Sequence, residues 1–248
     1  MSKNDRDRPG QLTALTFDFW GTLYQNAYAH DERVYMLHEL LERHNRSRSE
    51  DEVTEAYHHA GSVWDRVWRE EQRSISIARW LDEIMDYLDV GLPDDVKARF
   101  GQEIEEVYLG GELPRPVPGA VEVVPELANR YRLGLISDTG LTPGRVLRQL
   151  MERDGLLSSF DALTFSDELG VAKPDPEPFL RTLDQLGARP EQAAHIGDLP
   201  ETDLQGARQV GMKAVLFLGV SEREDGRELA DAVFDDYAEL TNLLERLE

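Results

Sequence analysis

Residues 12–23 read Leu-Thr-Ala-Leu-Thr-Phe-Asp-Phe-Trp-Gly-Thr-Leu, and this stretch decides the fold. Its apolar start is long enough for one buried strand and ends at Asp18, and Gly21 then lets the backbone turn away. In an open α/β sheet, the carboxyl ends of the strands border the ligand-binding crevice because the loops there diverge. Asp18 alone is more typical of a turn or a helix cap, so its meaning depends on the strands that follow.

The composition favours a soluble, cytoplasmic protein. The 248 residues suffice for one large domain or for a core with a smaller insert. The absence of cysteine excludes disulfides and thiolate metal sites, and it suits a reducing compartment. Residues 1–11 are polar and mixed in charge, which indicates a disordered lead-in rather than a secretory signal. No apolar segment is long enough to cross a bilayer.

The formal net charge of -22 limits the choice of partners. Nucleic acids and anionic membranes attract basic surfaces, so we expect neither as a partner. A small anionic substrate would also enter against this field and would need a local cation to receive it. The sequence carries no signal for an oligomeric state.

Between residues 26 and 113 the apolar residues fall at helical spacing, which predicts an all-helical insert. Turn-forming clusters at 45–49 and 91–95 divide it, and we expect Asp94 or Asp95 to cap the helix after the second cluster. The blocks that carry this spacing are Val34, Leu37, Leu40, Leu41; Val53, Ala56, Tyr57; Val63, Trp64, Val67, Trp68; Ile77, Trp80, Leu81, Ile84; and Phe100, Ile104, Val107.

From residue 114 onward helices and strands alternate. Short apolar runs predict strands at 132–136, 162–165, 193–196 and 214–218, with helices at 120–129, 144–153, 178–186 and 202–210 and a closing helix from 239. Near-continuous apolar strands separated by helices predict a parallel sheet that is covered on both faces. Asp18, Ser137 and Asp198 then stand at one edge of this sheet. His195 lies inside an apolar strand and is interpreted as structural.

Four short motifs occur in a specific order. They are Asp18-Phe19-Trp20-Gly21-Thr22-Leu23, Ser137-Asp138-Thr139, Lys173-Pro174-Asp175-Pro176, and Gly197-Asp198 with Asp203 five residues later. Together they resemble the haloacid dehalogenase superfamily of hydrolases, over residues 15–244. The resemblance implies a Rossmann-like α/β core made of residues 12–25 and 114–248. It also implies that residues 26–113 form a small helical cap that closes over the core.

The chemistry of the motifs follows from charge. A carboxylate attacks a phosphate dianion poorly because the two repel each other, so a cation must hold both. Asp18, Asp198 and Asp203 offer the oxygen ligands that Mg²⁺ prefers. Lys173 adds a positive charge that can neutralise Asp18 and contact a phosphate oxygen. The Ser137 hydroxyl can hold a further oxygen, together with N–H groups at the start of the next helix.

The resemblance assigns further roles. It implies that Asp18 is a nucleophile that forms an aspartyl-phosphate, with Ser137 and Lys173 also in catalytic positions. It implies a phosphate-binding set of Thr22, Ser137, Asp138 and Lys173, and a magnesium set of Asp18, Asp198, Asp203 and the backbone carbonyl of Trp20. The substrate class that it implies is a small phosphorylated metabolite. We expect residues near Asn26 and Tyr28, and the helix with Trp64 and Trp68, to face the crevice, although the two tryptophans are more typical of core packing.

Position 20 departs from the family pattern. Phosphatases of the family carry a second Asp there as the general acid and base, whereas an indole cannot transfer a proton. One hypothesis is a phosphatase limited to good leaving groups, or one with a proton carrier from the cap. A second is a 2-haloacid dehalogenase, because those enzymes have an aromatic residue at this place and a halide leaves without a proton. They work without metal, however, which leaves Asp198 and Asp203 without a purpose. A third is a non-catalytic protein that binds a phosphorylated ligand.

Overall fold

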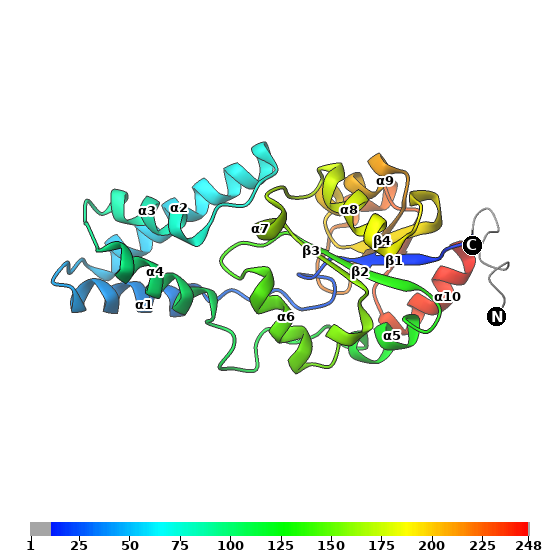
Figure 1. Ribbon diagram of the computed structural model, residues 1–248, viewed down its shortest axis with the longest axis horizontal. Coiled ribbons are helices and arrows are strands. Elements are labelled where there is room, and N and C mark those ends of the chain that lie inside the picture. The colour runs from blue at the N-terminus through cyan, green and yellow to red at the C-terminus, as the bar shows by residue number, and fades with distance from the viewer. Residues whose placement is uncertain (1–10, 248) are drawn as a thin grey trace.

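The computed structural model describes residues 11–247, and its centre is a parallel sheet of six strands (Figure 1). The strand order is β3-β2-β1-β4-β5-β6. The bounds are β1 (Ala14–Phe17), β2 (Arg132–Ser137), β3 (Ala162–Phe165), β4 (Ala193–Gly197), β5 (Lys213–Phe217) and β6 (Ala232–Phe234). The predicted parallel α/β sheet is therefore confirmed. Within the described range, no helix combines the length and apolar character needed to span a bilayer.

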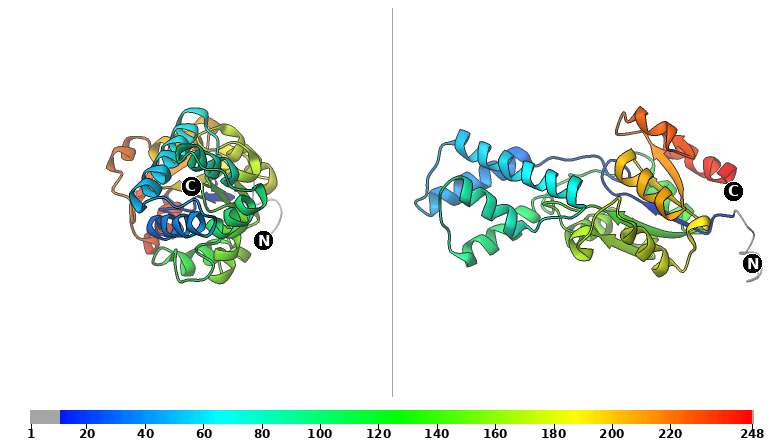
Figure 2. Two further views of the ribbon diagram at one scale, coloured as in Figure 1. Left: turned by 90° about the vertical axis from the view of Figure 1, so that its left-hand side faces the viewer. Right: turned by 90° about the horizontal axis from the view of Figure 1, so that it is seen from above.

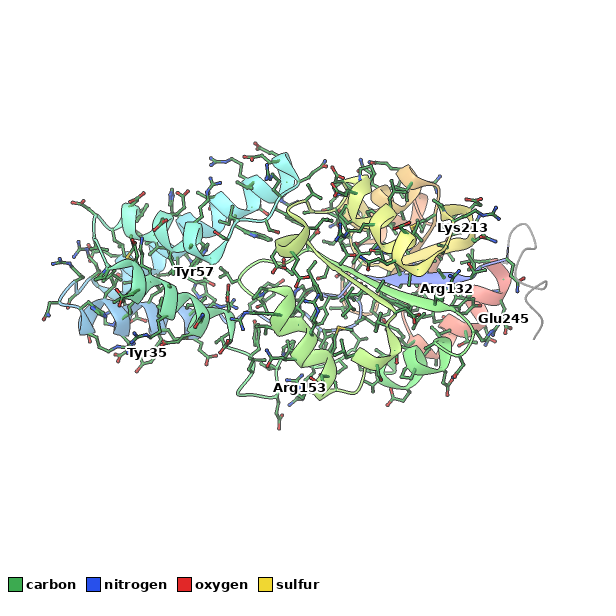
Figure 3. All side chains as sticks on the ribbon, in the orientation of Figure 1. Tyr35, Tyr57, Arg132, Arg153, Lys213 and Glu245 are labelled. Atoms are coloured by element: carbon green, nitrogen blue, oxygen red, sulfur yellow. The ribbon has the colours of Figure 1, made fainter. Side chains whose placement is uncertain are left out.

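β1 lies between β2 and β4, and all four of its residues are buried because helices cover both faces of the sheet. Phe17 pairs with Leu135 of β2 on one side and with Ile196 of β4 on the other, so the three strands end almost level. In Figure 3, Arg132 and Lys213, which begin β2 and β5, lie at the end of the sheet that points away from α1–α4. The carboxyl ends of the strands therefore point toward those four helices.

Helices cover both faces of the sheet (Figure 1). One face carries α5 (Ala120–Leu127), α6 (Gly144–Arg153) and α10 (Tyr237–Leu247), which share an apolar core with β1 and β2. The other carries α8 (Pro176–Leu186) and α9 (Gln205–Val210), which share a second core. The shorter elements are α7 (Ser166–Leu169), a π-turn at Pro200–Leu204, and 3₁₀ turns at Leu157–Ser159, Pro190–Gln192 and Glu224–Glu228.

The remaining helices form a separate group beyond the carboxyl edge of the sheet (Figure 2). They are α1 (His30–Arg43), α2 (Glu50–Glu71), α3 (Ile77–Tyr87) and α4 (Asp94–Glu105). They bury an apolar core of their own that includes Leu37, Trp80 and Phe100. The two blocks predicted around 53–57 and 63–68 belong to the single helix α2, whose start is fixed by a capping box between Ser49 and Glu52.

Two expectations need correction, and one strand was not expected. The cap position before α4 is Pro93, and Asp94 and Asp95 lie in the first turn instead, where their charge still suits the helix dipole. β6 was not predicted because its three residues, of which only Phe234 is fully buried, are too few to show an alternation. The helix expected at 202–210 is divided between two elements. Its first residues belong to the π-helical turn Pro200–Leu204, and α9 begins at Gln205. Of the lead-in expected at 1–11, all but the last residue lies outside the described residues.

Because α1–α4 share an apolar core of their own, we expect a large loss of stability when a buried side chain is removed from it. Trp80 is 1% exposed and its ring meets that of Tyr57 edge-on at 5.0 Å, whereas Tyr87 on the same helix is 48% exposed. We expect Trp80→Ala to lower the free energy of unfolding by about 3–5 kcal/mol and Tyr87→Ala to lower it by less than about 1 kcal/mol. Urea unfolding followed by circular dichroism measures both. Equal losses would show that this core does not hold the four helices together.

Candidate active site

The structure brings the first, third and fourth motifs to a shared ammonium group. Lys173 Nζ lies 2.5 Å from Asp18 Oδ1 and 2.6 Å from Asp203 Oδ1. All three side chains are almost completely buried. Asp198, at the end of the neighbouring strand, is also buried. Residues up to 185 positions apart in the sequence therefore meet at the carboxyl edge of the sheet.

Backbone geometry fixes the carboxylates. Gly21 has a φ of 71°, and a Cβ atom there would lie 2.3 Å from Asp198 Oδ2. A Cβ atom on Gly197 would lie 2.3 Å from Asp203 Cγ. The N–H of Leu199 donates a hydrogen bond to Asp203 Oδ2 at 3.0 Å. The two glycines therefore allow the aspartates to approach the backbone where any larger residue would displace them.

The carboxyl groups of the cluster differ in the direction in which their pKa values are shifted. Burial raises the pKa of Asp18, although the charge of Lys173 opposes this rise. Burial, reinforced by the charge of Asp203, raises the pKa of Asp198 to about 7. Burial alone would raise the pKa of Asp203, but Lys173 and a hydrogen bond from His195 hold it below its usual range. Burial likewise works against the charge on Lys173, yet Asp18 and Asp203 raise its pKa.

His195 joins this network, which its position in an apolar strand did not predict. Its Nε2 lies 3.2 Å from Asp203 Oδ1 and its Nδ1 lies 2.8 Å from the hydroxyl of Thr16. Burial lowers the pKa of His195, so the ring is neutral and carries one N–H. An ionised carboxylate only accepts, so Nε2 donates to Asp203 and Nδ1 accepts from Thr16. His195 therefore has a structural role, and that role is to orient Asp203.

The acidic cluster has the composition of a divalent-ion site. Carboxylate oxygens of Asp18, Asp198 and Asp203 lie within 4.8 Å of one another. Three buried carboxylates face the single ammonium of Lys173, and Asp198 Oδ1 is buried without a hydrogen-bond partner among the described residues. A donor set made only of oxygens suits Mg²⁺. The residues present therefore fit the ion.

The other predicted residues lie around this cluster in different ways. Ser137 ends β2 and is buried at the same sheet edge. Thr22 is buried, its hydroxyl has no partner within residues 11–247, and its carbonyl accepts a hydrogen bond from Tyr237. Asp138 uses both carboxylate oxygens in hydrogen bonds to protein N–H groups. Trp20 packs its ring edge-on against Phe19 at 4.9 Å.

Sequence reasoning missed Ser221, whose hydroxyl donates a hydrogen bond to Asp198 Oδ2. This residue follows the carboxyl end of β5 by four positions. The rule that drew attention to Asp18 and Asp198 therefore also applied to Ser221. Asp18 and Asp198 directly follow their strands, whereas Ser221 comes only four residues after β5, so no short motif marked it.

Comparison with known proteins shows the family of this chain and several relatives of known name. Residues 12–211 match the family model of the haloacid dehalogenase-like hydrolases. A phosphoglycolate phosphatase of Rhodospirillum rubrum is 37% identical over 163 residues, which cover 62% of this chain and 66% of the relative. A phosphoserine phosphatase of Thermus thermophilus is 33% identical over 114 residues, which cover 46% and 45% respectively. The chain thus spans about two thirds of the first relative and under half of the second.

Solved structures share the whole architecture. A 2-haloacid dehalogenase of Pseudomonas syringae superposes with a TM-score of 0.72 at 24% identity, covering 96% of this chain and 100% of that one. At this identity the likeness concerns the fold. The fold alone therefore does not separate phosphoryl transfer from dehalogenation.

The raised pKa of Asp198 predicts a pH dependence of stability in metal-free protein. Because the folded state holds this proton more tightly, the stabilisation is complete below the unfolded pKa and is lost as the pH rises through about 7. Asp198→Asn cannot ionise, so we expect a shallower loss and a gain of about 2–4 kcal/mol over the parent at pH 8. Urea unfolding in EDTA at pH 5, 6.5 and 8 measures this.

The matched control is Asp184→Asn on α8, where an exposed carboxylate keeps its water in both states. We expect this variant to keep the parent's dependence on pH. A parallel change in both variants would contradict the assignment of the slope to the buried cluster.

Proposed function

Because this chain belongs to the haloacid dehalogenase-like hydrolases, we propose that it is a phosphatase-type, Mg²⁺-dependent hydrolase whose nucleophile is Asp18. The observation that carries the proposal is the shared ammonium of Lys173, 2.5 Å from Asp18 Oδ1 and 2.6 Å from Asp203 Oδ1. Burial raises the pKa of Asp18, and the ammonium of Lys173 opposes this rise and so favours the ionised form that attacks.

In the first step a carboxylate oxygen of Asp18 forms a bond to phosphorus, and the bond from phosphorus to the leaving group breaks. Lys173, Ser137 and the N–H groups that follow it stabilise the charge on the phosphoryl oxygens. In the second step water attacks the aspartyl-phosphate and releases inorganic phosphate, which restores Asp18. Asp198 and Asp203, with the carbonyl of Trp20, would hold Mg²⁺, which offsets the repulsion between Asp18 and the dianion.

Trp20 determines which leaving groups depart. Its ring packs against Phe19 and lies 6.2 Å from that of Tyr108, so an aromatic side chain takes the place of an acid two residues after the nucleophile. Without a proton donor the leaving oxygen departs as an anion. We therefore propose that aryl and acyl phosphates, whose leaving groups are stable anions, are turned over best.

The substrate class follows from the surroundings of the site. Both relatives described above are named for small phosphorylated metabolites, and we propose a substrate of that class. We propose that α1–α4 act as the cap. The residues that line a surface groove of about 540 Å³, Arg66 and Arg69 among them, all belong to α2, so this groove is not part of the aspartate cluster. Arg69 lies 3.8 Å from Glu201 of the core and is a cation of the proposed cap that approaches the carboxyl edge of the sheet. Nucleic acid remains excluded by the charge of -22, and we place the protein in the cytoplasm.

Replacement of the nucleophile gives the most direct test. We expect Asp18→Asn to lower Mg²⁺-dependent release of phosphate from para-nitrophenyl phosphate by on the order of 10⁴-fold or more, because an amide does not attack phosphorus. The control Asp184→Asn is exposed on α8 and keeps the parent rate. Phosphate release that survives in Asp18→Asn refutes the assignment.

Restoring the acid tests the account of position 20. We expect Trp20→Asp to raise turnover of an alkyl phosphate by about 10²–10⁴-fold, since the new carboxyl group can protonate a poor leaving group. Turnover of the aryl phosphate should change much less. Steady-state kinetics on both substrates measure the difference, and equal effects would contradict the explanation.

Trp20 also favours a second candidate, a 2-haloacid dehalogenase, because a departing halide needs no proton. The buried Asp198 argues against it, because its Oδ1 has no hydrogen-bond partner among residues 11–247 and would have no role in a reaction without metal. Asp203 does not decide between the two, since it also holds Lys173. Release of chloride from 2-chloropropionate in EDTA would establish this activity instead. Failure of both assays, with thermal stabilisation by inorganic phosphate, would indicate a protein that only binds phosphorylated ligands.

A further inference from the structure

We propose that Trp68 and Asp138 form a polar link between the helices α1–α4 and the core. When these helices contact the core, the link holds Lys173 in position. This inference rests on the proposed function for its kinetic readout. Asp138 is the positioning residue of the link, because it touches Lys173 rather than the reacting atoms.

The link consists of one carboxylate held at both oxygens. Asp138 Oδ1 accepts a hydrogen bond from the backbone N–H of Lys173 at 2.9 Å. Asp138 Oδ2 accepts one from the indole Nε1–H of Trp68 at 2.9 Å. Trp68 belongs to α2, whereas the ammonium of Lys173 lies on Asp18 and Asp203. Two hydrogen bonds therefore separate the helical group from the cation of the site.

Two further contacts across this boundary end on the same two loops. The backbone N–H of Ala172 donates to the carbonyl of Gln72 at 2.7 Å, directly before Lys173. The hydroxyl of Ser74 donates to the carbonyl of Thr139 at 2.8 Å, directly after Asp138. The end of α2 and the residues after it thus rest on the loops that carry the second and third motifs.

The charge of Asp138 argues against its expected role in binding phosphate directly. A carboxylate repels a phosphate dianion, and both oxygens already have protein donors. Burial raises the pKa of Asp138, while the charge of Lys173 and the N–H of Trp68 oppose the rise. Loss of the indole N–H of Trp68 would leave Asp138 Oδ2 without a hydrogen-bond donor, which favours a shift of the loop that carries Asp138.

The chain offers a matched control for the hydrogen bond. The ring of Trp64 stacks on that of Trp68 at 5.4 Å, and its Nε1 is buried without a partner in the described part of the chain. Trp68→Phe and Trp64→Phe therefore remove similar aromatic area from the same helix. Only the first removes a hydrogen bond.

The test measures kcat and KM for para-nitrophenyl phosphate with Mg²⁺, and urea unfolding in parallel. We expect Trp68→Phe and Asp138→Asn to lower kcat roughly ten- to hundredfold with little change in KM, and Trp64→Phe to stay within about twofold of the parent. The double variant Trp68→Phe/Asp138→Asn should fall no further than Asp138→Asn alone, because Trp68 acts through Asp138.

Four outcomes would overturn the proposal. Equal losses in Trp68→Phe and Trp64→Phe would assign the effect to packing. Additive losses in the double variant would make the two residues independent. A rise in KM alone for Asp138→Asn would make it a phosphate ligand. A lower unfolding midpoint with unchanged kcat would likewise leave only a structural role.

A parent protein that releases no phosphate would refute the proposed function and would still leave the link testable. Hydrogen exchange of the Lys173 backbone amide, followed by NMR, then replaces kcat. We expect faster exchange in Trp68→Phe and an unchanged rate in Trp64→Phe, since only the first loosens the acceptor of that amide. An unchanged rate in both would overturn the link.

Discussion

The shared ammonium of Lys173 is the interaction on which the rest of the site depends. It bridges Asp18 and Asp203 and opposes the effect of burial on both, so that the pKa of Asp203 falls below its usual range while that of Asp18 stays above it. Every neighbouring feature serves this arrangement. His195 and the N–H of Leu199 orient Asp203, and Gly197 leaves room for its side chain. The excess of negative charge that remains is what makes a divalent cation a chemically reasonable partner.

The sheet explains why such distant residues meet. Parallel strands that end level deliver Asp18, Ser137 and Asp198 to one edge, and this follows from short apolar runs in the sequence alone. Most strands and core helices could be predicted for the same reason. β6 could not, because three residues carry too little pattern. The continuity of α2 was also hidden, since spacing reveals an apolar face but does not tell whether two blocks share one helix.

Side-chain partners were harder to predict than positions. The spacing of Trp64 and Trp68 indicates packing, which holds for the stacked rings, but it does not reveal that one indole N–H meets Asp138. Ser221 and His195 became visible only when the fold placed them beside Asp198 and Asp203. Trp20 is different, because its departure from the family pattern is plain in the sequence. Its consequence for leaving groups follows from the chemistry of indole without any coordinates.

The end of α10 and the amino end of β1 both lie on the side of the sheet that faces away from α1–α4 (Figure 2). An attachment at the end of α10 would therefore hold the molecule on the side away from α1–α4. A label or a surface placed there does not stand between these helices and the carboxyl edge of the sheet. A single-molecule measurement from this anchor could then follow the position of α2 relative to the sheet.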